Sequence, residues 1–371
     1  MPDITFTLRT LTPLFVAGAD QATAELRAPS FRGLMRYWQR ALVGGLVPLS
    51  TVREVETAVF GSTERASAVT VRVSAPSHKP VAFNEQLSVR TGGIWRSTGK
   101  GYLLWTMARS GQENRGNLKP ARWYFPPGTT FRTTLSTRGT DTSGLDQAIA
   151  AFWLLTHLGG IGSRSRRCAG SLSIQDLEGS HASPLPFYFG EHAPQDAQVL
   201  KYFLEEGLNK VRTITRPALV PAIEHEIAAR KLPPGVAEQE ITHKKASIGQ
   251  PLRDPPFDIL APGICRICIL QDTQPWSSAE TAMTRLGENL QEYRSQIPLS
   301  LRKIFGLPLP PLILNKRRAS GLLLRVVELQ HGRYAGLAVL FKTTGGGVSA
   351  KDYHLIDQWI DTFDTVQEVQ L

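Results

Sequence analysis

The sequence has few cysteines and no long apolar segment. Three cysteines occur among 371 residues, an odd number that excludes a complete disulfide framework and is typical of a reducing compartment. The longest apolar run, around residues 148–155, is far shorter than the roughly 20 residues that a membrane-spanning helix needs. The N-terminus has no basic segment followed by an apolar one. We therefore expect a cytoplasmic protein with no membrane segment.

The sequence also lacks the common patterns of catalytic and metal sites. Cys265 and Cys268 have the spacing of a metal knuckle, but there is no second cysteine pair, and the alternation around them predicts two structural cysteines on a strand. The eight histidines form no HExxH motif. In GIWRSTGKG, five residues separate Gly93 from Gly99, whereas a P-loop has four, which excludes a Walker A site. No metal, cofactor or catalytic apparatus is predicted.

Positive charge, by contrast, is plentiful and unevenly distributed. The net charge is +10, and residues 1–180 hold 21 Lys and Arg against 12 Asp and Glu, while residues 181–371 hold 21 against 20. A basic lobe attracts phosphate polymers, acidic membrane surfaces or acidic proteins. The length of the chain favours two domains with substantial cores over one.

Hydrophobic periodicity predicts the same order of elements in both halves of the chain. The first half reads as strand 4–15, helix 28–42, strands 68–74 and 101–109, helix 145–158 and strand 171–177, with a long loop over 111–129. The second half reads as strand 263–272, helix 278–305, strands 321–329 and 334–342, helix 352–363 and strand 365–371. The order strand-helix-strand-strand-helix-strand is that of the ferredoxin-like split βαβ fold.

We therefore predict an α+β protein with two ferredoxin-like (RRM-like, βαββαβ) domains in tandem, over 1–180 and 263–371. Local text supports an internal repeat, because segments 59–73 and 304–326 both run from Phe-Gly through Arg-Ala-Ser into a strand. The connecting segment, 181–262, contains one predicted helix over 195–211 and then a proline-rich stretch, which reads as an insertion or a mobile connection.

A glycine-rich loop that carries three arginines is the most distinctive motif. It follows the apolar helix 145–158 and contains Gly159, Gly160, Gly162 and Gly170 together with Arg164, Arg166 and Arg167. Glycine lets backbone N–H groups approach an anion closely. The loop follows a helix and enters a strand, however, whereas Rossmann and P-loop motifs require a strand, then the loop, then a helix. We therefore interpret the anion as the phosphate backbone of a nucleic acid.

Two further basic segments accompany the loop. The helix 28–42 carries Arg32, Arg36 and Arg40 as a stripe at i, i+4 and i+8, with Tyr37 and Trp38 beside it. Trp38 lies on the apolar face, so Tyr37 is the better candidate for contact with a base. A second basic run, NKRRAS, contains Arg317 and Arg318. Arginine forks pair with phosphates and stack on unpaired bases, so these residues predict binding of single-stranded RNA. An ordinary solvated helix face is the alternative for the stripe.

The combination of motifs resembles a known family. LTPLFVAGADQ, RAPSFRGLMRYWQRAL, VFGSTERAS, GGIGSRSRRCAGS and RRASGLLLRV, in this order, resemble the RAMP superfamily of CRISPR proteins, and most closely the two-domain first subunits of type III-B Cmr effector complexes. The sequence departs from the family's Arg-Arg-Gly-aromatic-Gly loop, because Cys168 and Ala169 follow Arg167.

The resemblance implies a subunit of a ribonucleoprotein that uses a CRISPR RNA guide to recognise and cut invading RNA. Such a subunit holds CRISPR RNA near its 3′ end, or target RNA, without cutting. Its expected partners are CRISPR RNA, single-stranded target RNA and other RAMP subunits. The matching helix residues are Arg32, Arg36, Tyr37, Trp38 and Arg40, and the matching loop runs from Gly159 to Gly170.

Two other functions stay open from the sequence. One is a metal-independent RAMP endoribonuclease that trims CRISPR transcripts, with His157 as its general base; the alternative for His157 is a histidine that caps carbonyls at a helix end. The other is a structural cap whose basic lobe docks an acidic partner. The fold alone does not decide among these roles, because one scaffold serves many functions.

Overall fold

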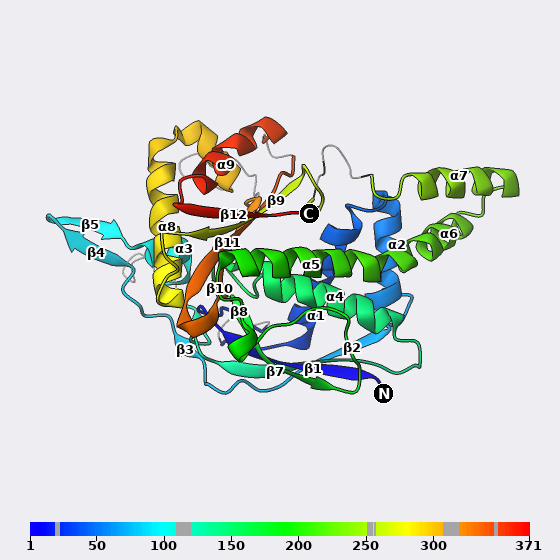
Figure 1. Ribbon diagram of the computed structural model, residues 1–371, viewed down its shortest axis with the longest axis horizontal. Helices are drawn as coiled ribbons and strands as arrows, with labels where there is room; N and C mark the ends of the chain where they lie inside the picture. The colour runs from blue at the N-terminus through cyan, green and yellow to red at the C-terminus, as the bar shows by residue number, and fades with distance from the viewer. Residues whose placement is uncertain (19–22, 109–119, 251–254, 256, 307–318, 345–347) are drawn as a thin grey trace.

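The computed structural model describes residues 1–18, 23–108, 120–250, 255, 257–306, 319–344 and 348–371. Two four-stranded sheets and the helices around them form its body (Figure 1). The helices of the described chain are α1 (Ala28–Val43), α2 (Leu49–Phe60), α3 (Gly99–Leu104), α4 (Ser143–Leu158), α5 (Ala197–Thr215), α6 (Leu219–Ala229), α7 (Pro234–Ala246), α8 (Ala279–Gln296) and α9 (His354–Ile360). Among these residues, no helix is both long and apolar enough to cross a membrane.

The first sheet is built entirely from the basic half of the chain. Its strands β1 (Asp3–Thr10), β2 (Val69–Val73), β7 (Thr130–Thr137) and β8 (Leu172–Gly179) are antiparallel and lie in the order β2-β7-β1-β8. Alternation sets which face is buried. Ile4, Phe6 and Leu8 are buried in the core beneath α1 and α4, while Thr7 and Arg9 point to the opposite face.

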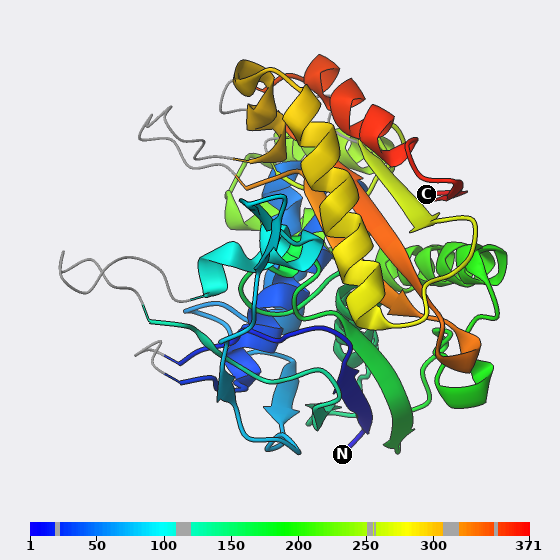
Figure 2. The same cartoon turned by 90° about the vertical axis from the view of Figure 1, so that its left-hand side faces the viewer.

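The second sheet repeats this arrangement. Its strands β9 (Cys265–Gln271), β10 (Leu322–Glu328), β11 (Tyr334–Phe341) and β12 (Thr365–Val369) lie in the order β10-β11-β9-β12 and are also antiparallel. In both sheets the first and third strands are therefore central. Figure 2 shows α8 lying across one face of this sheet, with α9 beside it. Phe60-Gly61 and Phe305-Gly306, the repeated sequence pair, each end a helical segment, and both glycines have positive φ (74° and 113°).

The two halves share one hydrophobic core. The face of the second sheet that is opposite α8 packs toward α4 and α5, and Ile267 and Val339 of this face belong to the same buried cluster as Phe6 and Trp153 of the first half. Helix α5 contacts both α4 and β12. At Gly207 of α5, a Cβ atom would lie 2.0 Å from the Trp153 ring, so glycine is required for this close packing.

The insertion between β2 and β7 differs from the prediction. We expected a strand over 101–109, but residues 99–104 form α3, because Thr98 caps this helix by accepting from the N–H of Gly101 (2.9 Å). Three short strands, β3 (Val81–Ala82), β4 (Ser88–Thr91) and β5 (Ile94–Ser97), precede α3. The predicted loop over 111–129 contains β6 (Trp123–Tyr124), which pairs with β3, and part of it lies outside the described residues.

The connecting segment contains more helix than predicted. The predicted helix 195–211 is α5, but α6 and α7 follow it, and α7 lies within the proline-rich stretch. The prolines indicated an irregular segment, but Pro233 and Pro234 lie at the start of α7. A proline is tolerated there, because the N–H groups of the first helical turn have no hydrogen-bond partner within the helix. Figure 1 shows α6 and α7 projecting from the body, at the end opposite the β4–β5 hairpin.

Candidate nucleic-acid interface

The glycines of the glycine-arginine loop (residues 159–170) serve close internal packing. A Cβ atom on Gly162 would lie 2.2 Å from the carbonyl oxygen of Phe15, and one on Gly170 would lie 1.9 Å from that of Ile161. Both glycines have positive φ. The loop's N–H groups are used within the fold as well, since Ser163 donates to Phe15 O (2.7 Å) and Gly170 donates to Pro13 O (2.9 Å). The loop is thus hydrogen-bonded to the segment that follows β1, and these N–H groups are not free to bind an anion.

The three loop arginines point into the protein. Arg164 donates to the carbonyl oxygen of Leu103 in α3 (2.7 Å from Nε). Arg166 forms an ion pair with Asp258 and donates to Ser320 O (2.8 Å). Arg167, which is 8% exposed, has three carbonyl partners: Arg166 O (2.8 Å), Leu322 O (3.0 Å) and Phe305 O (2.7 Å). Burial lowers the pKa of Arg167 to about 9, so its charge persists at neutral pH.

A buried arginine of the second half makes the reciprocal contact. Arg325 on β10 is 2% exposed and donates to the carbonyl oxygens of Thr156, at the end of α4, and Leu172, at the start of β8 (2.8 Å). The N–H of Cys168 also donates to Leu324 O (2.9 Å). We call Arg166, Arg167 and Arg325 the junction arginines, because each bonds a carbonyl of the other half. Sequence reasoning missed Arg325, whose only signal is a charge inside an apolar strand.

The predicted arginine stripe on α1 is real but is partly neutralised. Arg36 pairs with Glu56 of α2, and Arg40 reaches the same carboxylate (2.9 Å). Arg32 makes one long contact to Val69 O (3.5 Å). The Glu56 side chain is 8% exposed, so two guanidinium groups compensate one buried carboxylate.

The two aromatic residues of α1 have different surroundings. The side chain of Trp38 lies in the core at 1% exposure, so its ring offers no surface on which a base can stack. Tyr37 is half-buried and donates to Asp258 Oδ2 (2.6 Å), and the guanidinium of Arg166 lies 5.7 Å from its ring centroid. The structure therefore joins Tyr37 and Arg166, two predicted RNA contacts, in one internal network with Asp258.

His157 is enclosed at the end of α4. Its ring stacks on Trp153 with centroids 4.5 Å apart, and Nδ1 lies 2.9 Å from Trp153 O. Burial lowers its pKa to about 3. A base that is buried and whose Nδ1 is bonded to a carbonyl matches the carbonyl-capping alternative for this residue. The basic run with Arg317 and Arg318 lies outside the described residues.

All three cysteines are free and buried. Burial raises the pKa of the thiols of Cys168 and Cys268 to about 12. Cys168 occupies the position where the family pattern has glycine, and its φ of 68° lies in the left-handed region that glycine favours. Among the described residues, no group of three or more His, Cys, Asp or Glu side chains is placed to hold a metal ion.

A groove of about 440 Å³ runs beside the glycine-arginine loop. Gly162 and Ser163 form one wall, Ser30 and Leu34 at the start of α1 form another, and Trp123 lies at the edge with 42% of its side chain exposed. The backbone of the predicted loop thus borders a surface groove, although its arginine side chains point elsewhere.

The β4–β5 hairpin exposes arginine and tryptophan side chains together. In its register Arg90 lies opposite Trp95 on one face, and Val89 lies opposite Arg96 on the other. Trp95 is 64% exposed, and Trp105, just after α3, is 61% exposed. Exposed tryptophans beside arginines are the composition that stacks and neutralises single-stranded nucleic acid. The hairpin stands clear of the body in Figure 1.

The base of this hairpin is fixed to the second half. Gly99 of α3 and Gly287 of α8 cross so closely that a Cβ on Gly287 would lie 2.0 Å from Gly99 O. The signal that identifies the hairpin was in the same segment: Gly92-Gly93 between two β-prone tetrapeptides is a hairpin turn.

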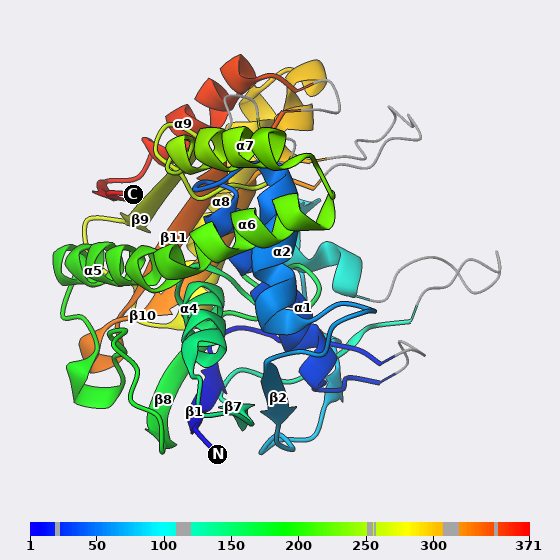
Figure 3. The ribbon, with the colours of Figure 1, turned by 90° about the vertical axis from the view of Figure 1, so that its right-hand side faces the viewer.

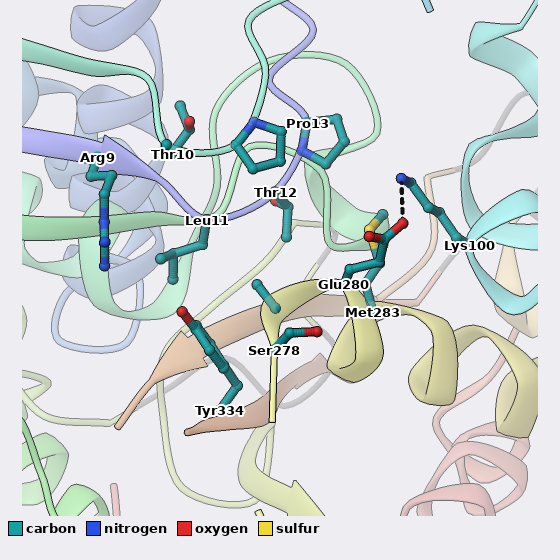
Figure 4. A pocket seen from close by; sticks show the side chains of 13 residues that line it. Arg9, Thr10, Leu11, Thr12, Pro13, Lys100, Ser278, Glu280, Met283 and Tyr334 are labelled. Atoms are coloured by element: carbon teal, nitrogen blue, oxygen red, sulfur yellow. Dashed lines mark hydrogen bonds and ion pairs between the residues drawn. The ribbon is translucent and has the colours of Figure 1, made fainter. Parts of the chain in front are cut away.

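A second hollow, of about 260 Å³, lies between the two halves beneath β1's end (Figure 4). Its cations are already paired. Lys100 pairs with Glu280 (2.9 Å) and with Glu85, and Arg9 pairs with Glu328. This cleft is therefore close to electrically neutral and is a weaker candidate for contact with phosphates than the hairpin.

Comparison with known proteins places the chain in a family. A family model of the RAMP superfamily matches residues 7–173. The chain is 35% identical over 185 residues to CRISPR system Cmr subunit Cmr1-2 of Pyrococcus furiosus, a match that covers 48% of this chain and 97% of that one. It is 26% identical over 326 residues to Cmr1-1 of the same organism, covering 86% of this chain and 81% of that one. The chain therefore belongs to the RAMP superfamily.

Solved structures share the fold of this chain. The crystal structure of Cmr1 from Pyrococcus furiosus in its apo form superposes with a TM-score of 0.60 and 21% identity over 100% of this chain and 99% of that one. A chain of the type III-B Cmr-beta complex bound to cognate target RNA gives a TM-score of 0.50 and 13% identity, covering 97% and 99%. Within the RAMP superfamily, the chain is a member of the Cmr1 family.

Proposed function

We propose that this chain is a non-catalytic, RNA-binding subunit of a type III-B Cmr effector ribonucleoprotein, and that its two sheets are tandem ferredoxin-like RAMP domains. Membership of the Cmr1 family supports the assembly, because the relatives are named as Cmr subunits. The order βαββαβ with central first and third strands in both sheets supports the domain type. Its RNA partners are CRISPR RNA and single-stranded target RNA, and its protein partners are other RAMP subunits.

The observation that carries RNA binding is the exposed arginine and tryptophan surface of the β4–β5 hairpin. Arg90 and Trp95 are a cross-strand pair on one face, so a phosphate and its neighbouring base can be bound together. Trp123 and the groove beside Gly162 supply a second surface, on the same basic half. We assign direct contacts to these surfaces and to Arg32, Arg36 and Arg40.

The junction arginines have a different role in this proposal. Arg166 and Arg167, predicted from sequence as RNA contacts, hold the two halves together, and Arg164 holds α3 against the loop. Their effect on RNA is to position the groove wall and the hairpin. Trp38 is left out of the RNA contacts because it is buried.

The experiment that tests the proposal separates binding from cleavage. Purified full-length chain is incubated with 5′-labelled single-stranded RNA across a salt series, and native and denaturing gels are run in parallel. We expect a shift that weakens steeply with salt, since each neutralised phosphate releases counterions, and intact RNA in every lane. No shift at low salt would contradict RNA binding by this chain.

The denaturing gel also tests the endoribonuclease alternative. RNA fragments that persist in EDTA and disappear in His157→Ala would make the chain a metal-independent nuclease and overturn the non-catalytic assignment. We expect no such fragments, because His157 is enclosed by Trp153, Tyr188 and Phe203 and an RNA 2′-hydroxyl needs a base within hydrogen-bond reach.

A further inference from the structure

A large hollow lies on the outer side of the first half, away from the hairpin and the groove. It has a volume of about 680 Å³, opens to the surface, and is bordered by α2, the first turn of α4, the segment after β8, the end of α5 and the start of α6. Figure 3 shows α2, α4, α5 and α6 side by side on this side of the molecule. The volume lies within the range of small-molecule sites, about 300–1,000 Å³.

Most of the wall is apolar. Its carbon surface comes from Ile214 and from small or cyclic side chains: Ala58, Ala182, Pro184, Pro217, Ala218, Pro221 and Ala222. Proline rings and alanine methyl groups leave flat faces with little freedom to move. A planar apolar ring is the ligand shape that buries most surface against such faces, and it displaces water at little entropic cost to the protein.

One polar atom behind this wall has no partner. Gln147 of α4 lines the hollow and is 7% exposed, but its Oε1 is fully buried in the present rotamer and accepts no hydrogen bond from any described residue. A buried acceptor without a donor is costly. The terminal torsion of a glutamine is broad, so the amide can turn to meet an N–H donor on a ligand in the cavity.

The rim adds acceptors and charged groups of both signs. Asp146 accepts from His181 (2.7 Å), and Glu54 lies 2.9 Å from Nδ1 of His225. Arg65 and Ser143 complete the rim. Carboxylates at the mouth of an apolar pocket suit ribose hydroxyl groups, which they bind in dinucleotide sites. Each carboxylate has a histidine partner, and Arg65 adds one positive charge to the rim.

We propose that this cavity is a nucleoside-binding site, with a heteroaromatic base against the proline and alanine wall, its amino group donating to Gln147 Oε1, and the ribose at the carboxylate rim. The site lies apart from the hairpin, and its occupancy is independent of the RNA-binding proposal. Adenosine carries the required exocyclic amino group, and purine riboside is the same molecule without it.

The test is calorimetric titration of the full-length chain with adenosine and with purine riboside, in the absence of RNA. We expect adenosine to bind about tenfold more tightly than purine riboside, the effect of one hydrogen bond to a buried acceptor. In Gln147→Leu we expect this preference to disappear while the midpoint of urea unfolding is unchanged or higher, because the substitution removes an unpartnered polar group.

A variant that fills the hollow gives a second, independent test of the proposal. Ala218→Trp places an indole in the cavity from a half-buried position and should abolish adenosine binding, whereas Ala237→Trp, at a half-buried position of α7 outside the cavity, should preserve it. Absence of adenosine binding at millimolar concentration would overturn the proposal. So would retention of the adenosine preference in Gln147→Leu, or normal adenosine binding by Ala218→Trp.

Discussion

Replacing Arg167 with methionine should destabilise the fold even though the loop that carries it reads as an RNA-binding motif. Methionine keeps the apolar stem of the side chain and removes the guanidinium. The carbonyl oxygens of Phe305 and Leu322 in the second half then lose a donor that lies 2.7 and 3.0 Å away. The site is buried, so water does not readily replace that donor.

The magnitude follows from two opposing effects. Each buried acceptor left unsatisfied costs about 1–3 kcal/mol, which gives about 2–6 kcal/mol for the two carbonyls. Part of this loss is offset, because a guanidinium with only carbonyl partners is itself expensive to bury. We expect a net loss of about 2–4 kcal/mol in the free energy of unfolding.

The assay is urea unfolding followed by circular dichroism, with Arg138→Met as the control. Arg138 is exposed at the end of β7, so its substitution should change stability by less than about 0.5 kcal/mol. If Arg167→Met unfolds at the same urea concentration as this control, the loop arginine does not join the two halves and the reasoning is refuted.

Three other predictions concern buried groups. The pKa of His157 is lowered from 6.5 to about 3, so between these pH values the unfolded state binds a proton that the folded state does not. The free energy of unfolding should therefore fall by about 1.4 kcal/mol per pH unit as the pH drops through that window. In acid unfolding, His157→Asn should show a shallower dependence of stability on pH, and an unchanged dependence would contradict the prediction. The three thiols should resist a thiol-reactive dye in the native protein and all react in denaturant; rapid native labelling would contradict their burial. Gly287→Ala should lower stability by about 1–3 kcal/mol, despite the better helix propensity of alanine, because its Cβ would meet Gly99 O; a stabilised variant in thermal unfolding would contradict the close crossing.

The periodic elements were the part of the fold that the sequence predicted well. Alternation identified all four strands of the second sheet and β1, β2 and β8 of the first, but it missed β7, because the third strand of that half was placed at 101–109. The shared Phe-Gly and Arg-Ala-Ser text pointed to a repeat that appears as the same strand order in each sheet. The predicted strand over 101–109 was wrong because its apolar run is short, and a cap at Thr98 turned it into a helix. Short apolar runs do not distinguish the two structures.

The site was less predictable because charge in a sequence does not reveal its partners. Arg166 and Arg167 look like phosphate ligands, and only the fold shows that Asp258 and four backbone carbonyls face them. Every residue has a backbone carbonyl, so the sequence does not indicate which residues will accept hydrogen bonds from these arginines. No hydrophobic periodicity around Trp95 indicates that its side chain is exposed. The neighbouring Gly92-Gly93 pair does predict a hairpin turn.

The most direct test of this account compares two exposed aromatic side chains. Trp95 on the hairpin is 64% exposed, and Tyr202 on α5 is 61% exposed. Fluorescence anisotropy with labelled single-stranded RNA gives the Kd of Trp95→Ser and Tyr202→Ser. Stacking of one base contributes about 1–3 kcal/mol, so we predict that Trp95→Ser weakens binding roughly tenfold or more while Tyr202→Ser matches the unsubstituted chain. Equal Kd values for the two variants would contradict the assignment of RNA binding to the hairpin.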